Sequence, residues 1–414
     1  MNYKDKKVAI IGYGLEGQDC EKFLKDKGSY VTILDQKFDK NYLSNLEKFD
    51  LIVRSPGIYP YKKELIKVHE NGIRITTPTH IFFDEFNGKV IAVTGTKGKG
   101  TTSTLIYEIL KKAKFDVFLG GNIGKPLLEL LPKLKSSSYV VMEISSFQLI
   151  DLPVSPDIAV ILNITLDHLD WHESKEEYIE AKKNIVKYQN TSDWAIINKE
   201  YKVSSSFARK TKANIMYFSK KTLKNEFKKD LILRGEHNLE NIAAAVSVSK
   251  VLNINEKIIL EVVKNFKGLE HRLEFVRKFK DIKFYNDSFA TGPQSTIAAI
   301  NSFTEDETLI LGGSDKGLDY LELGKIISKR KNCKNIILIG LIRNQIKKAL
   351  VDAKFKGKII DLGTSSIDKI VEKAFGITQK DGVVILSPAA ASFDMFLNYK
   401  DRGNKFKEAV WNLS

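Results

Sequence analysis

The stretch Lys89-Val-Ile-Ala-Val-Thr-Gly-Thr-Lys-Gly-Lys-Gly-Thr-Thr102 decides the fold. It predicts a buried strand, a glycine-rich turn and the start of an apolar-periodic helix. Backbone N–H groups of such a turn, the positive end of the helix and the Lys99 ammonium together favour phosphate, and the Thr101 hydroxyl is suited to Mg²⁺. The spacing is shorter than in the common phosphate-loop pattern, and Gly100 stands where that pattern has a hydroxyl residue. We predict an ATP-binding loop of Gly95, Thr96, Lys97, Gly98, Lys99, Gly100 and Thr101.

Composition limits the class of protein. A length of 414 residues predicts about three domains. The sequence has no apolar run long enough to cross a bilayer, and its two cysteines fit a reducing cytoplasm. The net charge of +15 is spread along the whole chain without a nucleic-acid-reading motif, so it favours acidic substrates.

The first 87 residues open with a glycine motif. Val8–Gly17 has the GxGxxG pattern between a predicted strand and helix, and Asp35 follows Gly17 by 18 residues (35 − 17). Taken alone, this pattern predicts NAD binding and leaves an NAD-dependent oxidoreductase as one alternative. The loop Arg54-Ser-Pro-Gly-Ile58 follows another strand, where ligands of α/β proteins bind.

Two further strands of the central region end in polar residues. Tyr139–Gln148 presents Glu143, and a strand at Ile158–Asn163 precedes His168. In a parallel sheet these ends lie on the edge of the phosphate loop, so Glu143, His168 and Thr101 could share one or two divalent cations. A salt-bridged strand acid and a capped loop histidine are the alternatives.

The order of predicted elements indicates an α/β fold with three domains. We expect a Rossmann-like domain at 1–87, a central domain with a parallel sheet like that of P-loop ATPases at 88–267, and a Rossmann-like domain at 268–414. Strands are expected near Trp194–Asn198 and Leu231–Leu233, and Asn238 is expected to cap a helix. No serine or cysteine stands in a triad-like setting.

Over essentially its full length the chain resembles the Mur ligases, the ATP-dependent amino-acid ligases of peptidoglycan precursor synthesis. The resemblance rests on segments in all three regions: Gly12–Gly17, Ser55–Ile58, Thr94–Thr102, Gly121–Gly124, Glu143–Leu149, Asp167–Asp170, Tyr178–Lys182, Gly235–Asn238, His271-Arg272, Asn286–Ser288, Leu311–Gly317, Ser387–Ala389 and Arg402-Gly403. The Glu143–Leu149 and Ser387–Ser392 runs are similar to those of the member that adds D-glutamate.

The resemblance implies ligation of D-glutamate to UDP-N-acetylmuramoyl-L-alanine through an acyl phosphate, a step of cell wall biogenesis that serves cell shape and cell division. It implies a cytoplasmic monomer that uses ATP, Mg²⁺ or Mn²⁺ and a lysine carbamylated by CO₂, without a membrane or nucleic-acid partner. The third domain would bind D-glutamate and close over ATP. A folylpolyglutamate synthetase-like ligase is the alternative.

The resemblance also implies roles for individual residues. It reassigns the first glycine motif from NAD to the UDP-substrate, with contacts from Leu15, Glu16, Asp35, Gly57, Asn122 and His168. The catalytic residues would be Lys99, Glu143, His168 and Lys182, and the metal ligands Thr101, Glu143, His168 and the carbamate of Lys182. Further ATP contacts would come from Asn241, Arg272 and Asp287, and D-glutamate contacts from Thr291, Lys316, Ser392, Phe393 and Tyr399. The chain departs from the family pattern at Gly100, Glu16, Phe289, Gly292 and Ser314.

Overall fold

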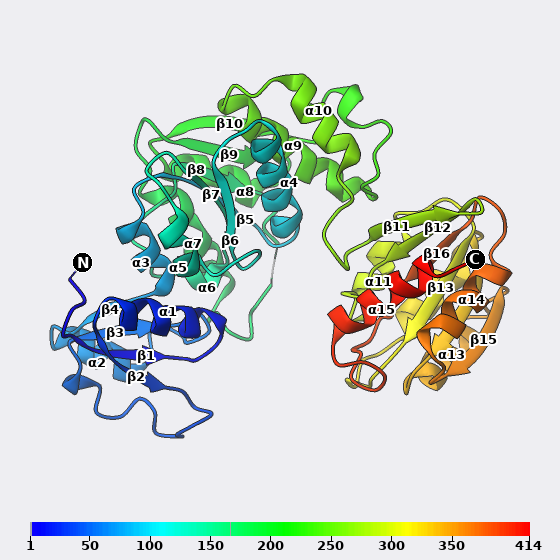
Figure 1. Cartoon of the computed structure of the whole chain (residues 1–414), viewed down its shortest axis with the longest axis horizontal. Coiled ribbons are helices and arrows are strands. Elements are labelled where there is room, and N and C mark those ends of the chain that lie inside the picture. The colour runs from blue at the N-terminus through cyan, green and yellow to red at the C-terminus, as the bar shows by residue number, and fades with distance from the viewer. Residues whose placement is uncertain (1, 166) are drawn as a thin grey trace. The chain divides into compact units, whose positions relative to one another are not determined.

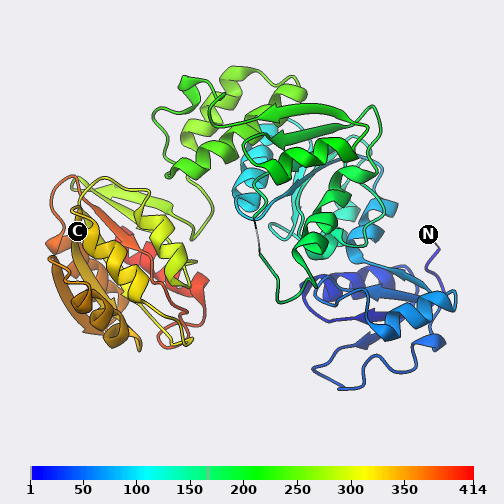
Figure 2. The ribbon, with the colours of Figure 1, turned by 180° about the vertical axis from the view of Figure 1, so that it is seen from behind.

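The structure, a computed structural model, describes residues 2–165 and 167–414. It contains three sheets, whose elements can be followed by colour in Figure 1 and from behind in Figure 2. The chain forms two compact units, Met1–Lys228 with Leu239–Val263, and Lys229–Asn238 with Lys264–Ser414. The first unit holds two of the sheets, and the division into three domains stays a prediction.

The first sheet has four parallel strands in the order β2-β1-β3-β4. Its strands are β1 (Lys7–Ile11), β2 (Tyr30–Leu34), β3 (Leu51–Arg54) and β4 (Arg74–Thr76), and its helices are α1 (Leu15–Asp26), α2 (Lys63–Glu70) and α3 (Pro78–Glu85).

The second sheet has six strands in the order β10-β9-β8-β5-β7-β6, and neighbouring strands are parallel throughout. Its strands are β5 (Lys89–Thr94), β6 (Val117–Gly121), β7 (Tyr139–Glu143), β8 (Ile158–Ile161), β9 (Trp194–Asn198) and β10 (Asn214–Phe218). The helices in this part of the chain are α4 (Lys99–Lys112), α5 (Leu127–Leu130), α6 (Ser146–Leu149), α7 (Lys175–Lys187), α8 (Lys202–Ser205), α9 (Glu236–Val251) and α10 (Glu256–Asn265). Five of the six residues of β5 are buried, as expected for a central parallel strand that is covered on both faces.

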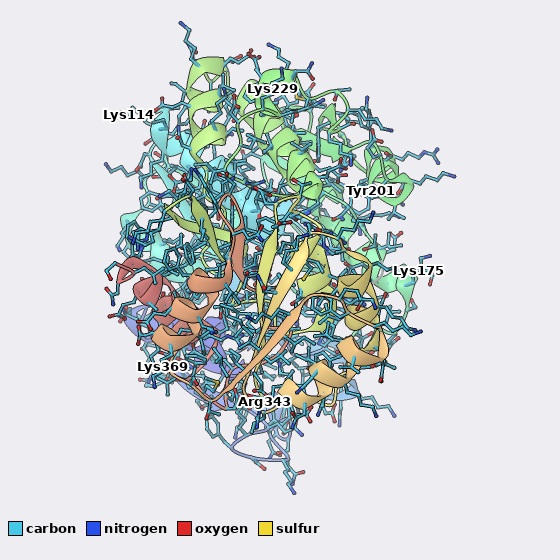
Figure 3. All side chains as sticks on the ribbon, turned by 90° about the vertical axis from the view of Figure 1, so that its right-hand side faces the viewer. Lys114, Lys175, Tyr201, Lys229, Arg343 and Lys369 are labelled. Carbon is cyan, nitrogen blue, oxygen red and sulfur yellow. The ribbon has the colours of Figure 1, made fainter. Side chains whose placement is uncertain are left out.

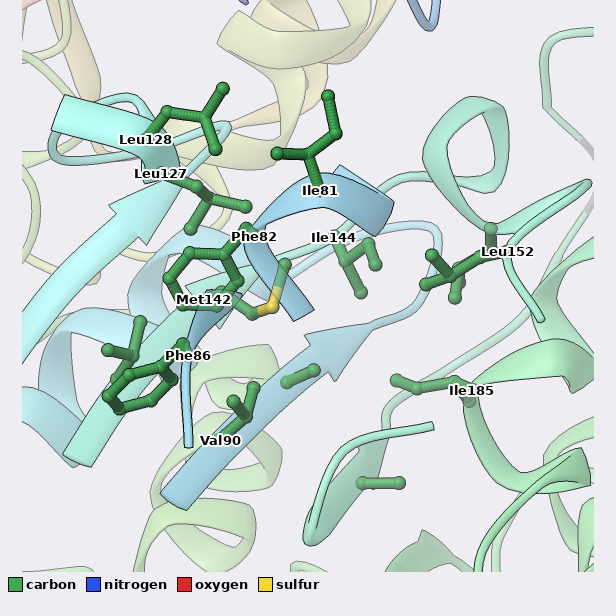
Figure 4. Packing of buried hydrophobic residues seen from close by; sticks show 14 of the residues in the cluster. Ile81, Phe82, Phe86, Val90, Leu127, Leu128, Met142, Ile144, Leu152 and Ile185 are labelled. Carbon is green, nitrogen blue, oxygen red and sulfur yellow. The ribbon is translucent and has the colours of Figure 1, made fainter. Parts of the chain in front are cut away.

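One apolar core runs through both sheets of the first unit. It joins Val8 and Ile10 of β1 to Val90 of β5 and Met142 of β7. Helix α3 packs into this core, where the rings of Phe82 and Phe86 lie 5.3 Å apart between their centroids (Figure 4). The first two sheets are therefore held together by burial of apolar side chains as well as by polar contacts.

The third sheet has the order β11-β12-β16-β13-β14-β15. Its strands are β11 (Glu274–Phe279), β12 (Ile282–Asn286), β13 (Glu307–Gly312), β14 (Cys333–Ile339), β15 (Lys358–Gly363) and β16 (Val383–Leu386). Two separate cores flank it, one with α11 (Pro293–Ile300), α12 (Leu321–Lys329) and α13 (Arg343–Asp352), the other with α14 (Ile367–Ile377) and α15 (Tyr399–Trp411). This sheet is doubly wound, as predicted, except that β11 pairs antiparallel with β12 at one edge.

Two local predictions are wrong. Leu231–Leu233 forms bends rather than a strand, since three apolar residues among charged neighbours do not determine an extended conformation. Asn238 does not cap a helix, because α9 already begins at Glu236 and the Asn238 side chain instead donates to the Arg234 carbonyl at 2.6 Å.

Lysines from separate parts of the chain lie on the surface. Lys114, Lys175, Lys229 and Lys369 are all exposed and belong to separate segments of the chain (Figure 3). In the described residues, no helix combines the length and apolar character that a membrane crossing requires.

Candidate active site

The predicted phosphate loop connects β5 to α4. Gly98 precedes the helix with a φ of 88°, and the Lys99 side chain folds back over the loop. Its Nζ donates to the carbonyls of Gly95 and Thr96 at 3.1 and 3.2 Å. The ammonium and the positive end of a 14-residue helix therefore act on the same small space, as a phosphate requires.

Asn241 of α9 lies directly against this loop. A Cβ atom at Gly98 would come within 2.2 Å of the Asn241 Oδ1, so a larger residue would force Asn241 to move, and the φ of 88° itself favours glycine. The Thr102 hydroxyl donates to the same oxygen at 3.2 Å. The structure thus brings one residue predicted for ATP binding to the loop from a distant part of the sequence.

Thr96 ties the phosphate loop to neighbouring segments of the chain. Its Oγ1 donates to the Thr165 carbonyl and accepts from the Thr165 N–H, each at 2.9 Å. The same Oγ1 lies 2.9 Å from the Tyr178 hydroxyl of α7. The loop is therefore held by the connection that follows β8 and by the helix that carries Lys182.

Lys182 is buried beneath the loop, with 2% of its surface exposed. Its Nζ donates to the Gly95 carbonyl at 3.1 Å and lies 4.9 Å from the centre of the Tyr178 ring. Burial, assisted by the Lys99 charge, lowers the pKa of Lys182 well below its usual range, against the opposite effects of Asp167 and Glu143. The site therefore favours a neutral amine at this position.

Glu143 ends β7 in register with Val93 of β5, which places it at the same sheet edge as the phosphate loop. His168 lies in the connection after β8, where its ring packs edge-on against Phe147 with centroids 4.9 Å apart. The His168 side chain is 47% exposed and its Nε2 lies 3.8 Å from Asp167 Oδ2.

Across residues 2–165 and 167–414, no three His, Cys, Asp or Glu side chains form a group that could hold a metal ion. Mg²⁺ commonly takes only one or two carboxylates and completes its shell with phosphate oxygens and water. Glu143 at the end of β7 and Thr101 in the first turn of α4 carry the kind of oxygen atoms that such an ion prefers.

A hydrogen-bonded serine, histidine and glutamate lie next to this edge, contrary to the expectation from sequence. His172 Nε2 lies 2.9 Å from the Ser146 Oγ, and its Nδ1 lies 3.2 Å from Glu177 Oε2. The Tyr59 hydroxyl donates to the other oxygen of Glu177 at 2.7 Å. Ser146 is only 1% exposed, so its hydroxyl is closed to a substrate and the group positions the chain rather than supplying a nucleophile.

Neither His172 nor Ser146 was singled out from the sequence. Burial lowers the pKa of His172, and the Glu177 carboxylate can only accept, so the neutral ring donates from Nδ1 and accepts at Nε2. A second histidine four residues after His168 was the available signal, but no spacing rule connects it to Ser146.

The glycine motif of the first sheet has the expected form. The Tyr13 and Lys37 N–H groups donate to the two oxygens of Asp35 at 2.7 and 2.9 Å, and these bonds lower the pKa of Asp35. Leu15, at the start of α1, is 77% exposed. Asn122 is exposed, and its N–H donates to the Glu143 carbonyl at 3.2 Å, which links it to the phosphate-loop edge.

Glu16 contacts helix α6, which follows β7 of the second sheet. Its Oε1 accepts from Gln148 Nε2 at 2.9 Å, while Gln148 Oε1 accepts from the Ser145 N–H. Burial raises the pKa of Glu16 to about 7, although the bond from Gln148 acts in the opposite direction. The Glu16 carboxyl group therefore holds its proton to a higher pH than an ordinary glutamate.

The second compact unit carries the other residues predicted for ATP. The Arg272 guanidinium lies 4.0 Å from the centre of the Phe289 ring. Asp287 accepts from the Ser387 hydroxyl at 2.7 Å, and burial raises its pKa to about 7. The departure at Phe289 thus supplies a stacking platform for a predicted ligand-binding arginine.

The predicted D-glutamate residues lie in the same unit but differ in exposure. Ser392 is 2% exposed, Phe393 is 71% exposed, and Lys316 is also exposed. Thr291 and Tyr399 are partly buried, and the Tyr399 ring packs edge-on against Phe289 with centroids 4.9 Å apart. Phe289 therefore connects Arg272 to the predicted amino-acid side.

Fully buried Arg402 fixes this region. It donates to the hydroxyl and carbonyl of Ser288 at 2.9 and 2.8 Å and to the carbonyls of Ala390 and Ala391 at 3.1 and 3.3 Å. Burial lowers the pKa of Arg402 to about 10. The arginine therefore holds the segment before Ser392 against the segment that carries Asp287.

A phosphate loop at the edge of a buried parallel sheet, with a lysine and a carboxylate beside it, defines a nucleotide-binding α/β enzyme. The Mur ligase middle domain matches residues 93–232. The UDP-N-acetylmuramoylalanine–D-glutamate ligase of Acetivibrio thermocellus is 37% identical over 98% of this chain and 96% of its own length. The enzyme of the same name from Clostridium tetani is 37% identical over 99% and 97%.

Solved structures support the fold. The UDP-N-acetylmuramate-alanine ligase of Thermotoga maritima has a TM-score of 0.59 at 17% identity, over 98% of this chain and 99% of that one. The MurF ligase of the same organism, in complex with ADP, has a TM-score of 0.57 at 17% identity, over 99% and 96%.

The chain belongs to the Mur ligases and, within them, to the UDP-N-acetylmuramoylalanine–D-glutamate ligase family. It is a ligase of peptidoglycan synthesis, and the predicted family and α/β fold class are confirmed. The alternative that the first glycine motif left open, an NAD-dependent oxidoreductase, gives way to this assignment.

Proposed function

We propose that this enzyme joins D-glutamate to UDP-N-acetylmuramoyl-L-alanine in the cytoplasm, at the expense of ATP. The observation that carries the chemistry is the phosphate loop with Lys99 folded over it and Lys182 buried against its Gly95 carbonyl. The relatives' names and their identity of 35–37% over nearly the whole chain support the choice of substrates.

The reaction needs two anions to meet. The carboxylate of the L-alanyl group attacks the γ-phosphorus of ATP, ADP leaves, and an acyl phosphate forms. The D-glutamate amine then adds to the acyl carbon, and phosphate leaves with its bonding electrons while the amine loses a proton. Repulsion between carboxylate and triphosphate is the barrier that the protein lowers, through Lys99 and the positive end of α4.

We assign ATP to the loop residues Gly95–Thr101 and to Asn241, Arg272 and Asp287. The UDP-substrate would contact Leu15, Glu16, Asp35, Gly57, Asn122 and His168. D-Glutamate would contact Thr291, Lys316, Ser392, Phe393 and Tyr399. The approach of Asn241 to Gly98 supports the ATP assignment, because it joins two members of that group.

Thr101, Glu143, His168 and Lys182 would hold Mg²⁺ or Mn²⁺, with Lys182 as a carbamate. When bound, the ion neutralises charge on the phosphates and the attacking carboxylate. A carbamate forms only from a neutral amine, and burial of Lys182 beside Lys99 favours that form. Carbamylation also replaces a cation by an anion with two oxygens, which a hard cation prefers.

The experiment is a measurement of ADP and phosphate release by the purified chain. Release should require UDP-N-acetylmuramoyl-L-alanine, D-glutamate and Mg²⁺ together, and a folate offered in place of the UDP-substrate should give none. Turnover with the folate would instead favour a folylpolyglutamate synthetase-like ligase. Light scattering at working concentration should give the mass of a monomer, 46.9 kDa.

A further inference from the structure

We infer that Arg54 and Trp171 are positioning residues for the UDP-substrate, because together they bind every backbone carbonyl of the loop Ser55–Ile58. This inference rests on the proposed function, in which Gly57 of that loop contacts the nucleotide. Neither side chain has been given a role in the reaction.

Arg54 is the last residue of β3 and is fully buried. Its Nε and Nη2 donate to the two carboxylate oxygens of Asp151 at 3.1 and 2.6 Å, in the fork geometry that arginine makes with carboxylates. Asp151 lies after α6, in the part of the chain that forms the central sheet. The guanidinium therefore anchors the first sheet to the second.

The remaining nitrogen of the same guanidinium faces the loop. Nη1 lies 3.2 Å from the Ser55 carbonyl oxygen, 3.4 Å from that of Pro56 and 2.5 Å from that of Ile58. The buried guanidinium of Arg54 is thus within hydrogen-bonding distance of three of the four loop carbonyls, on the side of the loop that faces the protein.

Trp171, in the connection between β8 and α7, binds the fourth carbonyl. Its Nε1 donates to the Gly57 carbonyl oxygen at 3.1 Å. The indole is itself fixed, since its centroid lies 4.4 Å from that of Phe147 and 5.3 Å from that of Tyr59. Trp171 therefore reaches the loop from a rigid aromatic group beside the phosphate edge.

The loop is also tied to the glycine motif. The Ser55 hydroxyl donates to the Gly12 carbonyl at 2.6 Å. On the opposite side the loop is open, because a Cβ placed at Gly57 would meet no atom within 4 Å. With all four carbonyls held on the protein side, the backbone presents one fixed face at Gly57 to a ligand, without the entropy cost of ordering it on binding.

The first test is Trp171→Phe, which removes the N–H donor and keeps an aromatic ring. We expect KM for UDP-N-acetylmuramoyl-L-alanine to rise about fivefold, the factor that corresponds to one hydrogen bond of ordinary strength, with kcat and KM for ATP unchanged. Trp411→Phe, at an exposed tryptophan of α15, is the matched control and should leave all three constants unchanged. An unchanged KM in Trp171→Phe would overturn the role of this residue.

The second test is Arg54→Lys, because a lysine cannot bind Asp151 and the loop carbonyls together. We expect calorimetry to show UDP-substrate binding weakened by about tenfold or more, while binding of a non-hydrolysable ATP analogue stays at the wild-type value. If the affinities for both ligands fall equally, Arg54 has only a structural role and the inference is contradicted. Arg74→Lys, at an exposed arginine, is the control.

The two possible failures are distinguishable. If wild type does not bind the UDP-substrate, the proposed function fails. If wild type binds it and both variants bind it equally well, only the inference fails.

Discussion

The Nε2 atom of His172 lies 2.9 Å from the hydroxyl oxygen of Ser146, in a place where both side chains are buried. Ser146 begins α6 just after the strand that ends in Glu143, and His172 precedes the helix that carries Lys182. The bond therefore joins two of the segments from which the phosphate edge is built. The other ring nitrogen of His172, Nδ1, contacts Glu177, and Glu177 in turn accepts from the hydroxyl of Tyr59, which follows β3 of the first sheet.

Replacing His172 by Phe should destabilise the first unit by about 2 kcal/mol, because the Ser146 hydroxyl and the Glu177 carboxylate lose a partner while the ring volume is kept. Urea unfolding followed by tryptophan fluorescence measures the change. Ser146→Ala in the His172→Phe background should cost little more than His172→Phe alone. Additive effects of the two substitutions would contradict the direct coupling.

Replacing Glu16 by Gln should change how stability depends on pH. Burial raises the carboxyl pKa from 4.5 to about 7, with Asp19 raising it further and Arg54 and Gln148 lowering it. Between these two values the folded state keeps a proton that the unfolded state has lost, so this group's contribution to stability is present below pH 4.5 and is lost as pH rises through about 7.

The Glu16→Gln variant should therefore gain stability relative to wild type between about pH 5 and about pH 8. Urea midpoints of both proteins at the two pH values measure this. If the urea midpoints of the variant and wild type differ by the same amount at both pH values, Glu16 keeps an ordinary pKa.

Substitution of Lys99 by Met or of Glu143 by Ala should each lower kcat at least about 100-fold, the scale for loss of one preorganised charged group. The unfolding midpoint should change little for Lys99→Met, which keeps most of the side-chain volume. Near-native turnover of either variant in steady-state assays would place the phosphate–metal site elsewhere.

Lys182→Ala should lose activity and regain part of it with added acetate, since a free carboxylate can occupy the place of the proposed carbamate. Lys183→Ala on the same helix is the control, because Lys183 pairs with the exposed Glu180 and not with the phosphate loop. Full activity of Lys182→Ala without acetate would count against carbamylation. So would an intact mass spectrum of wild type that lacks the increment of about 44 Da from one bound CO₂.

The central strand, the phosphate loop and the helix after it could be predicted because their signals are local. A run of buried residues, a glycine turn and 3.6-residue periodicity all fall within Lys89–Lys112. The triplet Leu231–Leu233 has no such context, and the antiparallel strand β11 depends on its pairing with β12. The triplet was therefore wrongly predicted as a strand, and β11 was not predicted.

The candidate site shows the same division. Lys182 was identified from its motif, but its depth beneath the Gly95 carbonyl comes from packing between α7 and β5. The Arg54–Asp151 pair spans 97 residues and the bond between His172 and Ser146 spans 26. Contacts of this kind depend on how separate elements pack against one another, which no periodicity within one element encodes.

The most direct test of the account is the choice of amino acid by the purified enzyme, with ATP, Mg²⁺ and UDP-N-acetylmuramoyl-L-alanine held at saturation. Phosphate release should be rapid with D-glutamate and should fall at least about 100-fold with L-glutamate, whose carboxylates cannot meet the same partners when the amine is in place. Equal release with the two enantiomers, or faster release with another amino acid such as L-lysine, would contradict the account.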